Sequence, residues 1–425
     1  MTLMMNIIRK AKDIPVRNEC DVLVVGAGPA GCGAAISAAR AGARTTLVEY
    51  GGKLGGMWTL GLLSPFFDNR HHDGLNRELR EALQARGCWG GLWDISFDPT
   101  EMAMLLDELA LDAGIDILFY TMATEPIMED GVLKGVIVEN KSGPQAILAK
   151  TVIDCTGDGD IAARAGAPFE IGGPADGACQ PMTMMFKIGG VKTEYGRDDT
   201  NGFYKALTQV VAETDVLEGV PFNNPAIIKL PREGEALIQW THIRHRLGTD
   251  GDELSKATLE GRQQIRRAME LFKAIRPVLG DVYLMELPMV IGVRETRRIR
   301  GEYYITDNDV KEAHRHDDGI CLVRFGVDIH EPSKSTQTCF GHKGFDIPLR
   351  SLVPLKVDNL LTAGRCISGS FVAHAAYRVT GDCLKMGEAA GVLAAIAAVK
   401  NVSVRSLVRM EPGIVIESIN KGGKI

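Results

Sequence analysis

The chain has 425 residues, of which 45% are hydrophobic and 24% are charged. These values are typical of globular proteins and exclude a disordered or fibrous chain. At about three times the usual domain length, the chain can bury one large core or two interleaved ones. The net charge is -6, with acidic and basic residues interspersed, so the broad positive field that attracts nucleic acid is missing and no nucleic-acid partner is expected.

The longest apolar runs, such as Gly391 to Val399 with its Ala-rich flank, are well short of the roughly 20 residues that cross a bilayer. Met1 to Asn18 carry Lys and Arg without an apolar core of signal-peptide length. We therefore expect a soluble, cytoplasmic protein. The nine cysteines form no CxxC pair, so the sequence predicts no metal site and no redox disulfide.

Residues Asp21 to Glu49 predict a strand, a helix and a second strand in that order. Val22 to Val25 form an apolar run typical of a strand buried on both faces. Pro29 to Ala41 predict a helix of small residues, and Thr45 to Val48 predict the next strand. This is the βαβ unit that opens a parallel sheet.

A helix is predicted over Asp98 to Asp112, because its apolar residues recur at helical spacing, and Ile115 to Phe119 predict a parallel strand. Short β runs follow, separated by turn signals such as Asp130-Gly131. We interpret them as a β-meander inserted into the α/β unit. The runs are Ile127 to Met128, Leu133 to Val138 and Gln145 to Leu148, after which Thr151 to Asp154 resume the parallel sheet.

The pattern changes after about Thr183, with long polar stretches, several strand-like runs and one helix expected over Ser255 to Ile275. The α/β pattern returns at Asn359 to Ala363, an apolar strand, and at Gly381 to Val399, a long helix. This return predicts that two parts of one α/β domain flank a second domain.

Gly26-Ala27-Gly28-Pro29-Ala30-Gly31 matches the dinucleotide fingerprint GxGxxG between the first strand and the first helix. The first two glycines allow a tight turn and close approach to a pyrophosphate, which the helix N-terminus stabilises. The third glycine lets helix and strand pack. Glu49 ends the second strand about 20 residues on, where an acidic side chain accepts hydrogen bonds from the ribose. The alternative is a glycine turn with an incidental acid.

The fingerprint serves both NAD and FAD, and three later features favour FAD. Gly51 to Gly56 are rich in glycine, which leaves room for a long cofactor. The strands at Thr151 to Asp154 and Asn359 to Ala363 run into the small-residue turns Cys155 to Asp160 and Gly364-Arg365. Several separated segments would thus converge on one extended cofactor.

We therefore predict an α/β protein with a Rossmann-like FAD-binding domain, an inserted β-meander and a second α+β substrate or cap domain. The predicted boundaries are 18–185 for the first part of the FAD-binding domain, 186–345 for the substrate or cap domain, 346–402 for the last part of the FAD-binding domain and 403–425 for a tail.

Four segments are distinctive: LGGMWTLGLLSPF, VIDCTGDGDIA, GVRETRRIRGEYYIT and NLLTAGRCISGSFVAHAAYRVTGDCLKMGEAAG. Together they resemble the FAD-dependent oxidoreductases of the glutathione-reductase fold, in the branch related to fumarate reductase and succinate dehydrogenase flavoproteins. They cover both ends and part of the middle of the chain, whereas Val191 to Val282 contribute little.

The resemblance implies roles at the cofactor. Glu49 would hold the ribose, Gly55 and Gly56 would line the path to the ribityl chain, and Ala123 would contact the adenine through its backbone. Arg365 stands where many flavoproteins have an acid, and it could bind the pyrophosphate by charge-assisted hydrogen bonds. The predicted cofactor contacts are Gly26, Gly28, Pro29, Ala30, Gly31, Glu49, Gly55, Gly56, Ala123, Gly157, Asp158, Gly364 and Arg365.

Three residues are predicted on the substrate side. His374 and Arg378 precede the last helix, and the resemblance implies that they bind substrate carboxylates. Arg294 belongs to the cluster Gly292 to Arg298, where an extended backbone would point Arg294 and Arg298 one way and Arg297 the other. A solvated basic strand, or an ion pair with a nearby glutamate (Glu295 or Glu302), is the alternative.

Other conspicuous residues have weaker functional interpretations. Some fumarate reductase relatives attach the flavin covalently through a histidine, and His71 and His72 are the candidates for such a link here. In those relatives the linking histidine lies nearer the pair Gly55-Gly56. We therefore expect FAD to be bound non-covalently. A structural role, on the surface or in the core, is the default for three further residues, Gln180, His342 and Tyr377. The core is also the expected place of the alternating apolar residues Met182, Met184, Met185 and Phe186.

The chain has one fingerprint and neither a second dinucleotide domain nor a CxxxxC pair near the first helix, which excludes a disulfide reductase. We expect hydride transfer between flavin N5 and a small polar organic substrate, which is either anionic or neutral. The electron donor or acceptor is unknown, and homo-oligomerisation stays open. The alternatives are a flavin-binding subunit with a structural or sensing role in a larger complex, and an NAD-binding Rossmann enzyme.

Overall fold

The computed structural model describes residues 13–192, 205–206, 209, 225–334 and 336–420. Its central sheet has the strand order β5-β2-β1-β8-β7-β6, with β19 also paired to β8. β1 (Val16–Val25), β2 (Thr45–Val48) and β5 (Asp116–Leu118) lie parallel to one another. The α/β fold predicted from the sequence is confirmed.

The meander continues the same sheet. β6 (Met122–Glu129) and β7 (Val132–Asn140) pair antiparallel, and β7 pairs antiparallel with β8 (Gly143–Asp154). The prediction of two separate strands within β8 was wrong, because both halves pair with β1 in one continuous register from Asn18 to Val25. On its other edge, the first half of β8 pairs with β7, and the second half pairs with β19 (Leu360–Thr362).

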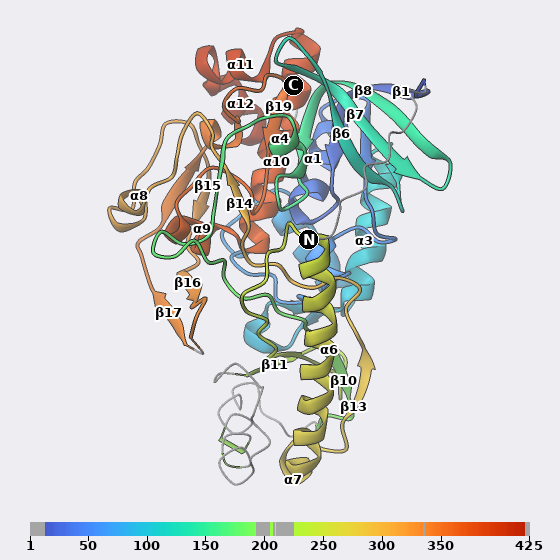
Figure 1. Ribbon diagram of the computed structural model, residues 1–425, viewed down its shortest axis with the longest axis vertical. Helices are drawn as coiled ribbons and strands as arrows, with labels where there is room; N and C mark the ends of the chain where they lie inside the picture. Colours follow the sequence, from blue (N-terminus) through green and yellow to red (C-terminus); the bar gives the residue numbers. More distant parts are fainter. Residues whose placement is uncertain (1–12, 193–204, 207–208, 210–224, 335, 421–425) are drawn as a thin grey trace, which may run out of the picture.

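Two helices rich in small residues cover the sheet side by side, α1 (Pro29–Arg40) and α10 (Thr380–Lys400) (Figure 1). Their backbones touch, since a methyl group added at Gly387 would overlap the carbonyl oxygen of Ala30. α3 (Pro99–Asp112) packs beside α1 and begins where the Asp98 carboxylate accepts the N–H of Thr100 at 2.8 Å.

A second sheet lies toward the opposite end of the molecule from α11 and α12, beside the long helix α6 (Gly251–Ala274) (Figure 1). Its strand order is β11-β12-β10-β13, all antiparallel. Phe186, Trp240 and Phe272 stack between this sheet and α6. The domain boundaries themselves stay a prediction. The strands are β10 (Phe186–Gly189), β11 (Ala226–Lys229), β12 (Ala236–Gln239) and β13 (Tyr283–Glu286).

Shorter elements connect the two sheets and complete the chain. The strand pairs are β3 (Trp89–Gly90) with β4 (Ser96–Phe97), β9 (Phe169–Ile171) with β14 (Arg297–Ile299), β15 (Gly319–Val323) with β18 (Phe345–Pro348) and β16 (Val327–His330) with β17 (Gln337–Phe340). The helices are η1 (Gly56–Trp58), α2 (Leu75–Ala85), η2 (Leu92–Asp94), α4 (Asp160–Arg164), α7 (Arg276–Leu279), α8 (Asp307–Lys311), η4 (Leu349–Leu352), α9 (Phe371–Tyr377), α11 (Val404–Met410) and α12 (Pro412–Asn420).

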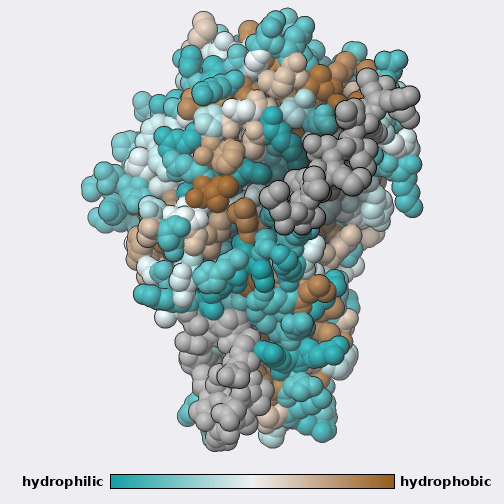
Figure 2. All heavy atoms as spheres, viewed as in Figure 1, coloured by the Kyte–Doolittle hydropathy of each residue, from teal (hydrophilic) through white to brown (hydrophobic). Residues whose placement is uncertain are grey.

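The segment predicted as a tail carries α11 and α12, and both pack against α10. Val404, Leu407 and Val415 belong to the main hydrophobic core. Among the described residues, no single helix has the length and apolar character needed to cross a membrane; α10 and α11 meet those criteria only together, as a pair bent by 100°. On the face drawn in Figure 2, hydrophobic residues gather in small separate areas on a mostly hydrophilic surface.

Candidate functional site

The fingerprint loop joins β1 to α1 at the carboxyl edge of the parallel sheet. Gly26 has φ +92, and a Cβ there would lie 2.7 Å from the carbonyl oxygen of Cys155. A Cβ at Gly31 would overlap the carbonyl oxygen of Gly26. At Gly28, by contrast, an added Cβ meets nothing within 4 Å. The loop is therefore closed toward the sheet and open at the N-terminus of α1, where Pro29 begins the helix and a pyrophosphate fits.

Glu49 ties the loop after β2 to the fingerprint loop. Its side chain is buried, and its two carboxylate oxygens accept the N–H of Ala27 at 2.8 Å and of Gly51 at 2.7 Å. Burial raises the pKa of this carboxyl group. Because a carboxylate has about four acceptor positions, it can also accept ribose hydroxyls.

Gly55 and Gly56 lie directly beside the fingerprint loop. The N–H of Gly55 donates to the carbonyl of Ala27 at 2.8 Å, and a Cβ at Gly56 would lie 2.7 Å from the Cα of Gly28. Both glycines have positive φ, +100 and +50, which favours glycine at each. The predicted path from the pyrophosphate therefore begins next to the open side of the loop.

Two further turns close the same edge of the sheet, after β8 and after β19. Gly157 and Gly364 have φ +83 and +94, and a Cβ at Gly364 would lie 3.0 Å from Ala30. Arg365 donates to Asp158 at 2.9 Å and to Thr296 at 3.2 Å. Two predicted cofactor contacts thus form an ion pair with each other.

Asp154, at the end of β8, shapes its turn and was not singled out as a site residue. It is fully buried, and its carboxylate accepts the N–H of Thr156 at 3.0 Å and of Ala162 at 2.8 Å. Ala123 lies on β6, where its carbonyl accepts a hydrogen bond from Arg164 at 3.2 Å. The cofactor residues from β1, β2, β8 and β19 thus meet at one edge, while Ala123 lies in the meander beside it.

His374 occupies α9 and is fully buried. Neither of its ring nitrogens makes a well-formed hydrogen bond. Burial, followed by the charges of Arg298, Arg378 and Arg365, lowers its pKa well below the usual value, so the imidazole is neutral at pH 7. Its ring packs edge-on against Tyr377, with the ring centroids 5.5 Å apart. Both nitrogens of this buried imidazole are therefore available to a ligand.

Arg294 and Arg378 lie near each other and near Asp328. Arg378 donates to the Asp328 carboxylate at 3.3 Å and to its carbonyl at 2.9 Å. Arg294 donates to the carbonyl of Pro181 at 2.5 Å and has no carboxylate within ion-pair distance among the described residues. Burial and then the charge of Arg378 lower the pKa of Arg294 to about 9. A buried cation, Arg294, and a partly buried one, Arg378, therefore share one acidic neighbour.

A chain of two histidines extends from Asp328. His330 lies 3.4 Å from the Asp328 carboxylate, and its other ring nitrogen lies 2.8 Å from His242. Burial, aided by Arg294, lowers the pKa of His330 to about 4. Burial would raise the pKa of Asp328, but the hydrogen bond from His330 and the charge of Arg378 outweigh it and lower that pKa. Gln180 accepts the N–H of His330 at 3.1 Å, so it belongs to this cluster.

Sequence reasoning missed His242, His330 and Asp328, since they come from segments with no recognisable motif. The three arginines of the 292–298 cluster have different surroundings. Arg298 forms an ion pair with Glu295, as in the alternative interpretation, and also donates to the carbonyl of Gly172 at 3.0 Å. Arg297 turns the other way and pairs with Asp160 at 2.8 Å.

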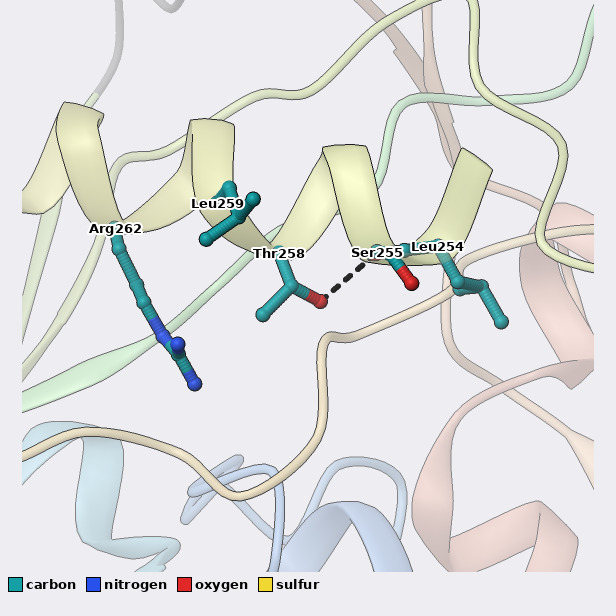
Figure 3. Close-up of a pocket in the computed structure, with 5 residues that line it drawn as sticks. All are labelled: Leu254, Ser255, Thr258, Leu259 and Arg262. Carbon is teal, nitrogen blue, oxygen red and sulfur yellow. Dashed lines mark hydrogen bonds between the residues drawn. The ribbon is translucent and has the colours of Figure 1, made fainter. Parts of the chain in front are cut away.

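A hollow on the outer side of α6 is not part of this site. Figure 3 shows that its lining residues all come from this one helix, where Thr258 donates to the carbonyl of Leu254 at 2.8 Å. No groups from other elements converge on it, so we place neither cofactor nor substrate there. The five lining residues are Leu254, Ser255, Thr258, Leu259 and Arg262.

Two curated proteins similar to this chain have different activities. The digeranylgeranylglycerophospholipid reductase of Methanoculleus marisnigri is 30% identical over 178 residues, which are 36% of this chain and 42% of that protein. The thiamine thiazole synthase of Aeropyrum pernix is 33% identical over 157 residues, which are 34% of this chain and 57% of that protein. The chain spans about half the length of these curated relatives.

A similar solved structure is a geranylgeranyl bacteriochlorophyll reductase-like protein from Thermoplasma acidophilum. It is 15% identical, with a TM-score of 0.46, and the match covers 96% of this chain and 88% of that one. The sequence model of the family described as FAD dependent oxidoreductase matches residues 21–414, which are nearly the whole chain. With that match and the glycine turns at the sheet edge, the protein belongs to the FAD-dependent oxidoreductase family, and its cofactor is FAD.

Proposed function

We propose that this oxidoreductase acts on a small organic anion, which Arg294 and Arg378 hold. The observation that carries the proposal is that the arginines of this cluster outnumber their acidic partners. Arg298 is balanced by Glu295 and Arg365 by Asp158, whereas Arg294 and Arg378 share Asp328. These side chains carry one excess positive charge in a place that is buried at Arg294 and partly buried at Arg378 and Asp328, and buried charges are ordinarily paired. A carboxylate on the substrate would supply the missing partner.

The residues beside this cluster can handle the proton that accompanies oxidation or reduction. FAD, when bound, supplies a two-electron donor or acceptor at its N5 atom. His374 is neutral, and its ring nitrogens have no well-formed hydrogen bond, so it can accept or relay a proton. His330 and His242 offer a second route, because their linked rings lead from Asp328 toward β12.

The cofactor contacts predicted from the sequence are part of the same proposal. The open side of Gly28 and the N-terminus of α1 would bind the pyrophosphate, and Glu49 would bind the ribose. The relation to fumarate reductase and succinate dehydrogenase flavoproteins is also proposed. The names of the two curated relatives indicate different substrates, so the substrate class rests on the arginines of this chain.

Anion binding to the FAD-loaded protein tests the proposal. A panel of small monocarboxylates and dicarboxylates, each paired with its neutral amide, would be titrated while the flavin absorbance is followed. Removing a charged hydrogen-bond partner costs about 1.5–3 kcal/mol, which is about a 10- to 150-fold loss of affinity. We expect that loss for both Arg294→Gln and Arg378→Gln.

Arg350→Gln is the matched control, because Arg350 pairs with Asp318 at 2.9 Å and lies partly exposed, away from the cluster. It should bind the anions as the wild type does. If the amides bind as tightly as the carboxylates, or if both cluster variants keep wild-type affinity, the substrate is not held as an anion by these arginines.

A further inference from the structure

A second cluster of ionisable side chains lies at the first turn of α10 and is separate from Arg294 and Arg378. His72 comes from the segment before α2, Cys321 from β15 and Asp382 from α10. All three are buried, and the exposed fraction of Asp382 is 0%. His72 is 249 residues from Cys321 and 310 from Asp382 along the chain, so no spacing motif could show them.

The three donor atoms converge on one another. His72 Nε2 lies 2.8 Å from Asp382 Oδ1 and 3.8 Å from Cys321 Sγ, and Sγ lies 3.5 Å from the same Oδ1. In a Cys-His-Asp catalytic triad, the acid and the nucleophile contact opposite nitrogens of the imidazole. Here both contact the same nitrogen. The arrangement therefore differs from that of a catalytic nucleophile and its general base. It matches the arrangement of three ligand atoms around one metal ion.

The distances suit a tetrahedral zinc ion. Usual Zn–N, Zn–O and Zn–S bond lengths place tetrahedral ligand atoms about 3.3 Å apart for the N–O pair, about 3.6 Å for N–S and about 3.5 Å for S–O. The S–O distance already agrees, and the N–S distance differs by about 0.2 Å. The His72–Asp382 pair would open by about half an ångström when the ion replaces their hydrogen bond.

A second observation points to a missing positive partner. Asp382 Oδ2 is buried and makes no well-formed hydrogen bond. Its acidic neighbour is Asp68, which itself belongs with His71 and His72 to an overlapping group of ligand atoms. Two carboxylates facing each other beside an imidazole and a thiol form a donor set that a divalent cation stabilises.

We propose that His72, Cys321 and Asp382 bind a zinc ion, with Asp68 or a water molecule as the fourth ligand. On binding, the Cys321 thiol gives its proton to solvent and bonds to the ion as a thiolate. The ion would fasten β15 and the segment before α2 to the start of α10 and so stabilise the fold around that helix.

Metal analysis of the full-length, FAD-loaded protein, purified without chelators from zinc-containing medium, tests the proposal. We expect about one zinc ion per chain, and substoichiometric zinc in His72→Gln, Cys321→Ser and Asp382→Asn. Cys88→Ser removes a thiol outside the cluster, and His314→Ala removes a member of the separate Asp309-His314-His316 group. Both controls should keep their zinc.

Cobalt replacement gives a readout that does not depend on activity or on the variants folding. Co²⁺ in a tetrahedral site with a thiolate absorbs strongly at wavelengths longer than the flavin bands, and we expect this absorption in the wild type. Trace zinc with no cobalt absorption in the wild type would overturn the proposal. Zinc that is lost in His314→Ala but kept in Cys321→Ser would also overturn it, because the ion would then be bound elsewhere. If the cluster variants do not fold, the wild-type cobalt spectrum decides.

Discussion

The two regions that we propose to bind the cofactor and the substrate, the cofactor end and the substrate end of the site, are built in different ways. At the cofactor end, three turns made of glycine and other small residues meet at the carboxyl edge of one parallel sheet. At the substrate end, charged side chains from segments far apart in the sequence, such as Arg294, Asp328 and Arg378, meet in a cluster that is buried or partly buried. The first region depends on the shape of the backbone and the second on the charges of side chains. Different changes should therefore disrupt the two regions.

The largest expected effect comes from the fingerprint loop. Gly31→Ala would force a methyl group onto the carbonyl of Gly26, and overpacking of this kind costs about 3 kcal/mol. We expect this variant to lose bound FAD and to unfold at lower urea concentration. Absorbance at the flavin band and urea unfolding measure the two losses.

Gly28→Ala is the matched variant, because an added methyl there meets no protein atom. We expect the FAD-free protein to unfold as the wild type does, while FAD binds more weakly. Equal FAD affinity in Gly28→Ala and the wild type would show that the pyrophosphate does not lie at this glycine.

Acid should destabilise the substrate end, where His330 and His374 are held neutral. The pKa of each is lower in the folded protein than the usual 6.5. The unfolded chain therefore binds more protons below pH 6.5, and the free energy of unfolding falls as the pH falls, for His330 down to its pKa of about 4. At pH 5 the loss is about 2 kcal/mol for His330, and His374 adds a loss in the same direction.

Urea unfolding at pH 7 and pH 5, at one ionic strength, measures this loss. His374→Asn should reduce the difference between the two pH values, by at most about 2 kcal/mol, and His314→Asn, which changes an exposed histidine, is the control. A pH dependence that is the same in His374→Asn and the wild type would contradict a neutral, buried His374.

The smallest effect is expected where the two regions meet, at Arg365 and Asp158. Their ion pair is mostly buried, with 17% and 18% of the side chains exposed. If Arg365 also binds the pyrophosphate, Arg365→Gln should weaken FAD binding by about tenfold, or about 1.4 kcal/mol, and Asp158→Asn should weaken it less. FAD titration of both variants and of the double variant makes this comparison. Equal losses in the two single variants would mean that Arg365 only stabilises the turn.

The same difference explains what the sequence could predict. The βαβ unit, the fingerprint turn and Glu49 follow each other within thirty residues, and each leaves a local pattern of glycine or apolar residues. The continuous strand β8 was predicted as two strands, because polar residues interrupt the apolar pattern in its middle. The two halves also have different neighbours, since the first half pairs with β7 and the second half with β19. His330 and His242 could not be predicted, since only tertiary packing brings the segment after β12 to the end of β16.

Helix α10 has a consequence for how the molecule opens. Its backbone touches α1 at Gly387 and Gly391, and its first turn carries Asp382 and, near Gly364, Cys383. Where two backbones touch, neither helix can shift without moving the other. The fingerprint loop, the loop that carries Arg378 and the His72 cluster should therefore belong to one cooperative unit, which opens as a whole rather than by fraying at one end.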